Sequence, residues 1–126
     1  MDCLYFVHDV RAGLIKIGCT EDCPLTRLNQ LRRLTHRSGL ELLGSIEIRS
    51  VGTYYYRTAK RELQRRFQTL RDHGDWFRSG LELANFIREN ARPHFCSRHC
   101  PDGSSIYEER RAAEEQADAA FAKVGL

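Results

Sequence analysis

Two short segments near the start of the chain, residues 3–8 and 14–19, consist mostly of apolar residues. Short apolar runs of this length are typical of β-strands, in which successive side chains alternate between the two faces, and the five residues between the segments include a glycine suited to a turn. The pattern therefore predicts an antiparallel hairpin. Side chains alternate between the two faces along each strand, and this alternation places Tyr5, Lys16 and Gly18 together on one face. The other face carries four apolar residues expected in the core: Leu4, Phe6, Ile15 and Ile17.

Three later segments repeat apolar residues every three or four positions, which is typical of amphipathic helices. Strand-like alternation occurs between the first two of them, over residues 40–49. Residues 72–77 are expected to form a turn that carries two aromatic core residues. We therefore expect an α+β domain of order β-β-α-β-α-α, with a small three-stranded antiparallel sheet flanked by helices. The predicted helices are residues 24–36, 53–71 and 81–90.

The pattern changes after residue 92, which suggests a domain over residues 1–92 followed by an appendage over 93–126. The first part of this appendage is polar and is expected to be a linker. Residues 106–123 are rich in Ala and Glu and predict an accessory C-terminal helix with a thin apolar stripe. Such a helix could fray, dock on the domain, or support a homodimer or a protein partner.

Charge is distributed unevenly along the chain. Residues 11–71 carry 13 Lys and Arg against 5 Asp and Glu, whereas residues 101–126 are acidic. A basic body suggests a polyanionic partner, and we expect DNA. Arginines that are simply solvated on helix surfaces are the alternative. The candidate DNA-binding residues are Arg32, Arg33, Lys60, Arg61 and Arg65.

Composition narrows the class of protein further. The 126 residues suit one domain, and no apolar run approaches the roughly 20 residues that span a bilayer, so we expect no membrane partner. The first residues do not have the pattern of a signal peptide, which predicts a cytoplasmic protein, or a nuclear one in a eukaryote. The five cysteines are an odd number and are expected to be free thiols in that compartment.

Four side chains of different chemistry are candidates for one catalytic site: Tyr5, Lys16, Arg27 and Glu62. Phosphodiester hydrolysis uses a carboxylate to hold a divalent metal ion and a guanidinium to bind phosphate oxygens. A phenol or an amine can help to orient the attacking water. Structural interpretations compete with these roles, because Tyr5 could be a strand aromatic and Glu62 could pair with Arg65 or Arg66 along its helix.

The order of these residues resembles the GIY-YIG endonuclease superfamily. Leu4-Tyr5-Phe6-Val7 stands where that family has GIY, and Ile15-Lys16-Ile17-Gly18 stands where it has YIG. The branch it resembles is named for a phage T5 open reading frame and a meiotically upregulated gene. Its pattern includes KIG, Rl..L, E..lh..F and geWF, where a dot is any residue. Over about residues 3–90 the chain supplies Lys16-Ile17-Gly18, Arg27-Leu28, Leu31, Glu62, Leu63, Phe67 and Gly74-Asp75-Trp76-Phe77.

The resemblance implies a metal-dependent hydrolase that cuts DNA. Tyr5 would act near the attacking water, and Gly18 would let the backbone approach closely. Arg27 would stabilise phosphate charge, and Glu62 would bind one Mg²⁺ or Mn²⁺.

Two departures from the family pattern keep a second function open. Lys16 occupies the position of the second tyrosine, and Leu31 occupies a position where many members have tyrosine or histidine. The alternative is a catalytically weak or inactive DNA-binding module of the same fold. A third hypothesis is an interaction protein whose acidic tail helix masks the basic surface or recruits a partner.

A separate group of metal-binding residue types lies in the tail: His94, Cys96, His99 and Cys100. Thiolate and imidazole suit Zn²⁺. The spacing matches no standard zinc finger, and the adjacent His99 and Cys100 would need strained backbone to bind one ion. Free thiols are therefore the favoured interpretation, with zinc as the alternative.

Overall fold

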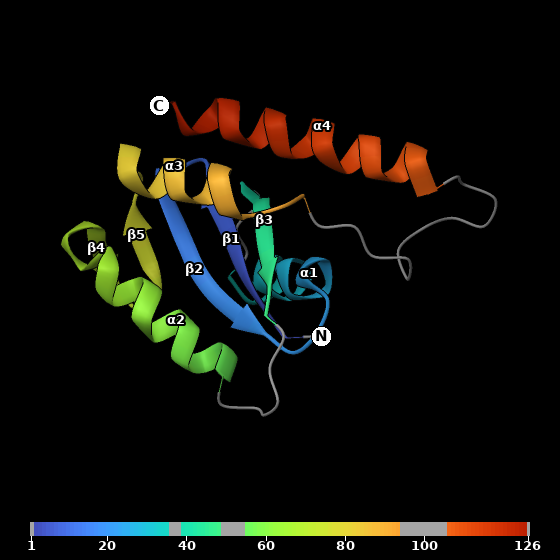
Figure 1. Ribbon diagram of the computed structural model, residues 1–126. Coiled ribbons are helices and arrows are strands. Elements are labelled where there is room, and N and C mark those ends of the chain that lie inside the picture. Colours follow the sequence, from blue (N-terminus) through green and yellow to red (C-terminus); the bar gives the residue numbers. More distant parts are fainter. Residues whose placement is uncertain (1, 36–38, 49–54, 94–105, 126) are drawn as a thin grey trace.

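Five strands form one antiparallel sheet with helices on both of its faces (Figure 1). The computed structural model describes residues 2–35, 39–48, 55–93 and 106–125. The sheet order is β3-β1-β2-β5-β4. The strands are β1 (Cys3–Asp9), β2 (Leu14–Thr20), β3 (Leu40–Glu47), β4 (Arg71–His73) and β5 (Trp76–Arg78). The helices are α1 (Pro24–Thr35), α2 (Tyr55–Arg66), the 3₁₀ turn η1 (Gln68–Leu70), α3 (Leu81–Asn90) and α4 (Ile106–Val124).

The predicted hairpin is confirmed, and its register pairs Tyr5 with Gly18 and Val7 with Lys16. The sorting of its two faces is also confirmed. The first face packs into the main core with residues of α2, α3 and α4, among them Leu63, Ile87 and Ala120. The alternation of side chains in the hairpin therefore decides which face of the sheet packs into the core.

The second face of the hairpin is buried as well, by α1. Tyr5 and Val7 pack there with Leu28 and Leu31 of α1 and with Trp76 of β5. Figure 1 shows α1 on the opposite side of the sheet from α2, α3 and α4. A polar side chain on this face, such as Lys16, consequently lies in a largely dry environment rather than in bulk water.

The α+β class is confirmed, but the sheet has five strands in place of the predicted three. The two strands that the sequence analysis missed, β4 and β5, have three residues each. Three residues are too few to show a period of two. They flank a turn in which Gly74 has a φ of +52°, a conformation that favours glycine. The predicted helix over 53–71 is shorter in the structure, because α2 ends at Arg66 before η1 and β4.

Three of the five cysteines lie in the described part of the chain, and all three are free thiols: Cys3, Cys19 and Cys23. The predicted free-thiol state is confirmed for them. Cys3 is fully buried, and burial raises the pKa of its thiol to about 11. A thiol with that pKa is protonated at neutral pH and is a poor nucleophile.

The tail helix α4 docks on the domain, which was one of the outcomes that the sequence left open. It packs mainly along β3, and its residues Ala117 and Ala120 are buried. Lys123 donates a 2.5 Å hydrogen bond to Glu41 of β3. Within the described ranges, no helix combines the length and the apolar character needed to cross a membrane.

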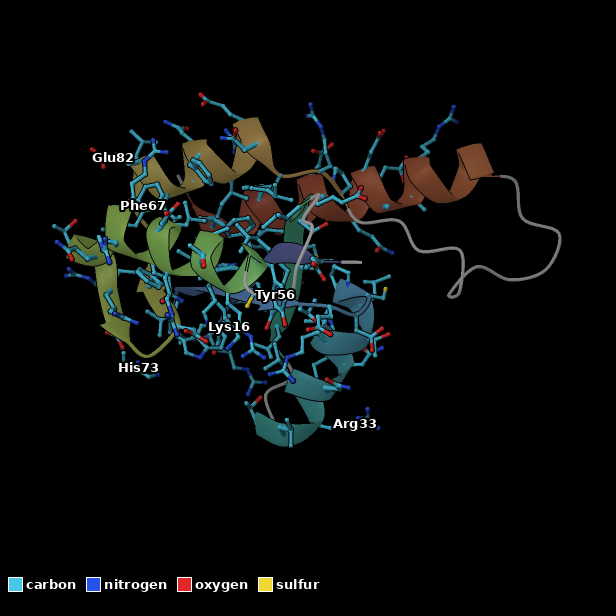
Figure 2. The ribbon with its side chains drawn as sticks, turned by 60° about the horizontal axis from the view of Figure 1, so that its bottom comes forward. Lys16, Arg33, Tyr56, Phe67, His73 and Glu82 are labelled. Carbon is cyan, nitrogen blue, oxygen red and sulfur yellow. The ribbon has the colours of Figure 1, made fainter. Side chains whose placement is uncertain are left out.

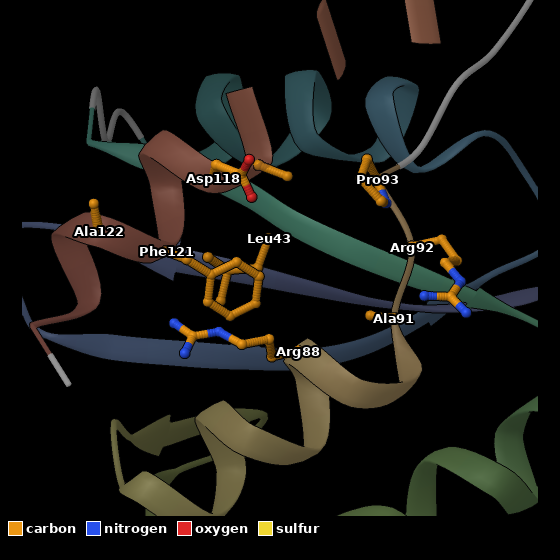
Figure 3. Close-up of a pocket in the computed structure, with 9 residues that line it drawn as sticks. Leu43, Arg88, Ala91, Arg92, Pro93, Asp118, Phe121 and Ala122 are labelled. Atoms are coloured by element: carbon orange, nitrogen blue, oxygen red, sulfur yellow. The ribbon is translucent and has the colours of Figure 1, made fainter. Parts of the chain in front are cut away.

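A pocket of about 400 Å³ lies between the end of α3, β3 and α4 (Figure 3). Its apolar part includes Leu43 and Phe121, and the Arg88 guanidinium lies 5.3 Å from the centre of the Phe121 ring. This cation–π contact links α3 to α4. The pocket thus lies at the junction between the tail helix α4 and the rest of the domain.

We expect Ala120→Asp to lower the free energy of unfolding by roughly 2 kcal/mol or more, because it places a carboxylate among buried apolar side chains. The matched control is Ala119→Asp, at an exposed position of the same helix, which should change stability by less than about 0.5 kcal/mol. Urea denaturation measures both. Equal stability of the two variants would contradict the docking of α4 in solution.

Candidate nucleic-acid interface

Tyr5 and Gly18 face each other across the hairpin, and the tyrosine ring lies directly over the glycine. A Cβ atom added to Gly18 would lie 2.5 Å from the Tyr5 hydroxyl oxygen, which is closer than atoms can approach. Only glycine leaves room for the ring at this position. Tyr5 is 1% exposed, so its hydroxyl is held in a defined place beneath α1.

Arg27 reaches this tyrosine from the first turns of α1. The helix begins at Pro24, where the missing N–H costs no helical hydrogen bond. Burial raises the pKa of the Tyr5 hydroxyl, and the hydrogen bond and positive charge of Arg27 offset part of that rise. The phenol is therefore protonated at neutral pH, where it can donate a hydrogen bond to an anion. Arg27 also donates to Oε1 of Gln30 at 3.2 Å, which orients its guanidinium.

Asp75 lies at the centre of a group of charged and polar side chains that we name the lysine–aspartate cluster: Lys16, Lys60, Gln64 and Asp75. The Lys16 Nζ lies 3.4 Å from Oδ2 of Asp75 and 5.7 Å from the centre of the Trp76 ring. The Lys60 Nζ lies 3.3 Å from the same carboxylate. In Figure 2 Lys16 lies between the ribbons of α1 and α2.

Backbone pairing explains how this cluster forms. The ladder between β2 and β5 ends at the pair Lys16–Trp76, so the next residue of β2, Ile17, has no strand partner on that side. Its N–H donates to the Asp75 carbonyl at 3.0 Å, and its carbonyl accepts from Gln64 Nε2 at 3.0 Å. Gln64 also donates to Oδ1 of Asp75 at 2.9 Å. Buried backbone groups need such partners, and here they tie α2 to the edge of β2.

Burial and charge shift the pKa values inside the cluster in predictable directions. Burial lowers the pKa of Lys16, and the Asp75 carboxylate opposes part of that shift. Burial alone would raise the pKa of Asp75, but the Gln64 hydrogen bond and the two ammonium groups outweigh it and leave the pKa below its usual range. Asp75 is therefore ionised at neutral pH, and its charge is already engaged by two cations.

The structure does not bring Glu62 to this cluster. Its side chain is exposed on α2, whereas Lys60 and Gln64 face Asp75. At 100° per residue, Glu62 points about 200° around the helix from Lys60. In the family fragment E..lh..F, counting back from Leu63 and Phe67 leads to position 60, which is lysine in this chain. The role of Glu62 in metal binding stays a prediction.

The described residues around the cluster do not fit a divalent metal ion. Mg²⁺ and Mn²⁺ need carboxylate or carbonyl oxygens that are free to coordinate. The carboxylate present, Asp75, already accepts from two ammonium groups and one amide. No group of three or more His, Cys, Asp and Glu in the described part of the chain could hold a metal ion. The proposed zinc residues, His94, Cys96, His99 and Cys100, lie outside the described residues.

The predicted DNA-binding residues have different surroundings. Arg33, Arg61 and Arg65 are exposed, and Figure 2 shows Arg33 at the far end of α1. Arg32 is exposed too, but it also donates to the Leu40 carbonyl at 2.7 Å and so connects α1 to β3. Lys60 belongs to the lysine–aspartate cluster.

Two residues of the cluster were not identified as site residues from sequence. The sequence places Asp75 in a predicted turn and gives no role to Gln64. The spacing of Lys60 and Gln64, one helical turn apart, was the signal that could have indicated a shared face.

We expect Gly18→Ala to lower the free energy of unfolding by roughly 1–3 kcal/mol, because the new methyl group collides with the Tyr5 ring in a packed layer. Gly39→Ala is the matched control, since its Cβ would meet the Arg11 side chain at an ordinary 3.4 Å. Chemical denaturation followed by Trp76 fluorescence compares them. A loss of equal size in both variants would show that the tyrosine does not occupy this place.

Comparison with known proteins assigns most of the chain to one family of domains. No curated protein and no solved structure matches the chain. The T5orf172 domain model matches residues 2–92, which covers β1 to the end of α3 and leaves α4 outside. This match agrees with the branch that the sequence resembles, and it is consistent with a nuclease-like or DNA-binding function. The chain belongs to the T5orf172 domain family.

Proposed function

We propose that this protein binds the sugar–phosphate backbone of DNA through the surface at the edge of β2, where side chains of α1 and α2 meet it from the two sides of the sheet. The observation that carries the proposal is the convergence of cations from these three elements. Lys16 and Lys60 meet at the Asp75 carboxylate, and Arg27 is close enough to act on Lys16 and to hydrogen-bond the neutral hydroxyl of Tyr5. Phosphate contacts by Lys and Arg supply most of the affinity in sequence-independent DNA binding. The family assignment makes DNA the expected polyanion.

Each group would hold a phosphate in a different way. The Arg27 guanidinium can bind two phosphate oxygens in a bidentate manner, and the Tyr5 hydroxyl can donate a further hydrogen bond. Exposed arginines on α2, such as Arg61 and Arg65, would extend the contact along the backbone. Contacts of this kind read charge and spacing, so we expect weak discrimination between DNA sequences.

A metal-dependent endonuclease is the second candidate. The packing of Tyr5 on Gly18 beside Arg27 agrees with the arrangement that the family resemblance implies. The carboxylate that would hold Mg²⁺ or Mn²⁺ in that function is Glu62, which lies on another side of α2 from the cluster. The donor set around Lys16 therefore favours binding over cutting.

We expect Arg27→Ala to weaken binding to duplex DNA about tenfold, which corresponds to roughly 1.4 kcal/mol, because it removes a charge-assisted contact to phosphate. Fluorescence anisotropy with a labelled duplex measures the change. Arg111→Ala, at an exposed position on α4, removes the same charge away from this face and should leave the affinity nearly unchanged. Equal losses in both variants, or no loss in either, would contradict the proposed interface.

A nicking assay separates the two candidates. We expect no conversion of supercoiled plasmid to nicked circles by the wild-type protein or by Glu62→Ala, with either Mg²⁺ or Mn²⁺ present. Nicking by the wild type that Glu62→Ala abolishes would establish the endonuclease in place of the binding module.

A further inference from the structure

Two ammonium groups share one carboxylate in the lysine–aspartate cluster. The Nζ atoms of Lys16 and Lys60 lie 3.4 and 3.3 Å from Asp75 oxygens. Charge-assisted N–H···O bonds are usually about 2.7–2.9 Å long, so both contacts are loose. Each ammonium has three donors. A single carboxylate cannot satisfy both groups, and the cluster retains a net positive charge.

The cluster can be reached from solvent. The side chains of Lys16, Lys60 and Asp75 are 11%, 25% and 31% exposed. The backbone of Asp75 is fixed by the bond between its carbonyl and the Ile17 N–H, whereas its carboxylate is held by side chains alone, through the Gln64 hydrogen bond and the two loose ammonium contacts. An anion that approaches from solvent needs only to displace carboxylate oxygens, while Gln64 keeps its separate bond to the Ile17 carbonyl.

Position 60 carries a positive charge in this chain, whereas the family pattern has a glutamate there, and this difference changes how the site would attract a phosphate. A glutamate there contributes a charge of −1 and needs a bound divalent cation to reach a net charge of +1. Lys60 supplies a charge of +1 by itself. The same local charge is thus available to a phosphate without any metal ion, because Lys16 and Lys60 together carry two positive charges against the single negative charge of Asp75.

We propose that the lysine–aspartate cluster is a metal-independent phosphodiester site, in which Lys16 and Lys60 exchange the Asp75 carboxylate for a phosphate oxygen. Asp75 acts as an internal anion that holds the two lysines in place until phosphate arrives. The inference rests on the proposed DNA-binding function. It adds that Lys16 and Lys60 bind the phosphate, that they release the Asp75 carboxylate in doing so, and that no metal ion is required.

The first experiment measures binding of a labelled duplex to the full chain at constant ionic strength, with EDTA or with Mg²⁺. We expect the dissociation constants to agree within about twofold, since any difference should reflect screening of phosphate charge alone. Affinity that is lost in EDTA and restored by Mg²⁺ would overturn the inference while leaving DNA binding intact.

Three variants locate the site. Lys60→Glu should weaken binding about tenfold or more, whereas Arg61→Glu, the same charge reversal at the exposed neighbouring position, should cost clearly less. Asp75→Asn should tighten binding, because it removes the competing negative charge and keeps a similar shape. Lys60→Gln removes the charge without reversing it. Circular dichroism of every variant shows whether the protein is folded. A Lys60→Glu loss no larger than that of Arg61→Glu, or weaker binding by a folded Asp75→Asn protein, would overturn the inference.

The second experiment does not depend on DNA. Inorganic phosphate is added in EDTA to protein labelled with ¹⁵N-lysine, and the Nζ signals are followed by NMR. Phosphate should shift the Lys16 and Lys60 signals, and Asp75→Asn should enlarge these shifts. That result would support the anion site even if the wild type did not bind DNA. A failure to bind DNA would then overturn only the proposed function. Unchanged signals for both lysines would overturn the site itself.

Discussion

The pairing of β2 with β1 along one edge and with β5 along the other is the constraint on which the site depends. Pairing with β1 sets Tyr5 opposite Gly18, and the missing side chain of the glycine gives the ring its place. Pairing with β5 stops at Lys16, so the backbone of Ile17 requires other partners. Asp75 and Gln64 supply them, and in doing so they carry a carboxylate and α2 to the same edge.

The charged cluster forms because the residues that pair with the Ile17 backbone, Asp75 and Gln64, also have polar side chains. Because α1 covers the face on which Lys16 lies, the ammonium is largely removed from water. A buried cation needs a nearby anion, which Asp75 provides, and the second ammonium of Lys60 prevents that anion from neutralising the cluster completely. The resulting surplus of positive charge, next to Arg27 and the neutral Tyr5 hydroxyl, is the physical basis for attracting phosphate.

Two faces of one sheet therefore serve different purposes. The face covered by α2, α3 and α4 contains most of the apolar core, and α4 contributes to it although the family match ends at residue 92. The face covered by α1 is thinner and contains the polar groups. Burial on the first face supplies stability that lets the second face tolerate a charged lysine and a restricted tyrosine.

Local patterns were sufficient for much of the fold. The period of two in the hairpin predicted which side chains share a face, and helical periodicity predicted α1 and α3 closely, since those signals depend only on neighbouring residues. The short strands β4 and β5 escaped prediction because three residues contain too little pattern. Their formation depends on the edge that β2 offers, which is a contact between segments about 60 residues apart.

For the site, the sequence by itself determined that Tyr5, Lys16 and Gly18 lie on one face and that a basic helix follows. Only the tertiary structure decided which residues of α2 meet them. A helix presents a new residue every 100°, so the choice among Lys60, Glu62 and Gln64 depends on how α2 rotates against the sheet. That rotation is set by the packing of Leu63 and Phe67 into the core, and it turns Lys60 and Gln64 toward Asp75 and leaves Glu62 in solvent.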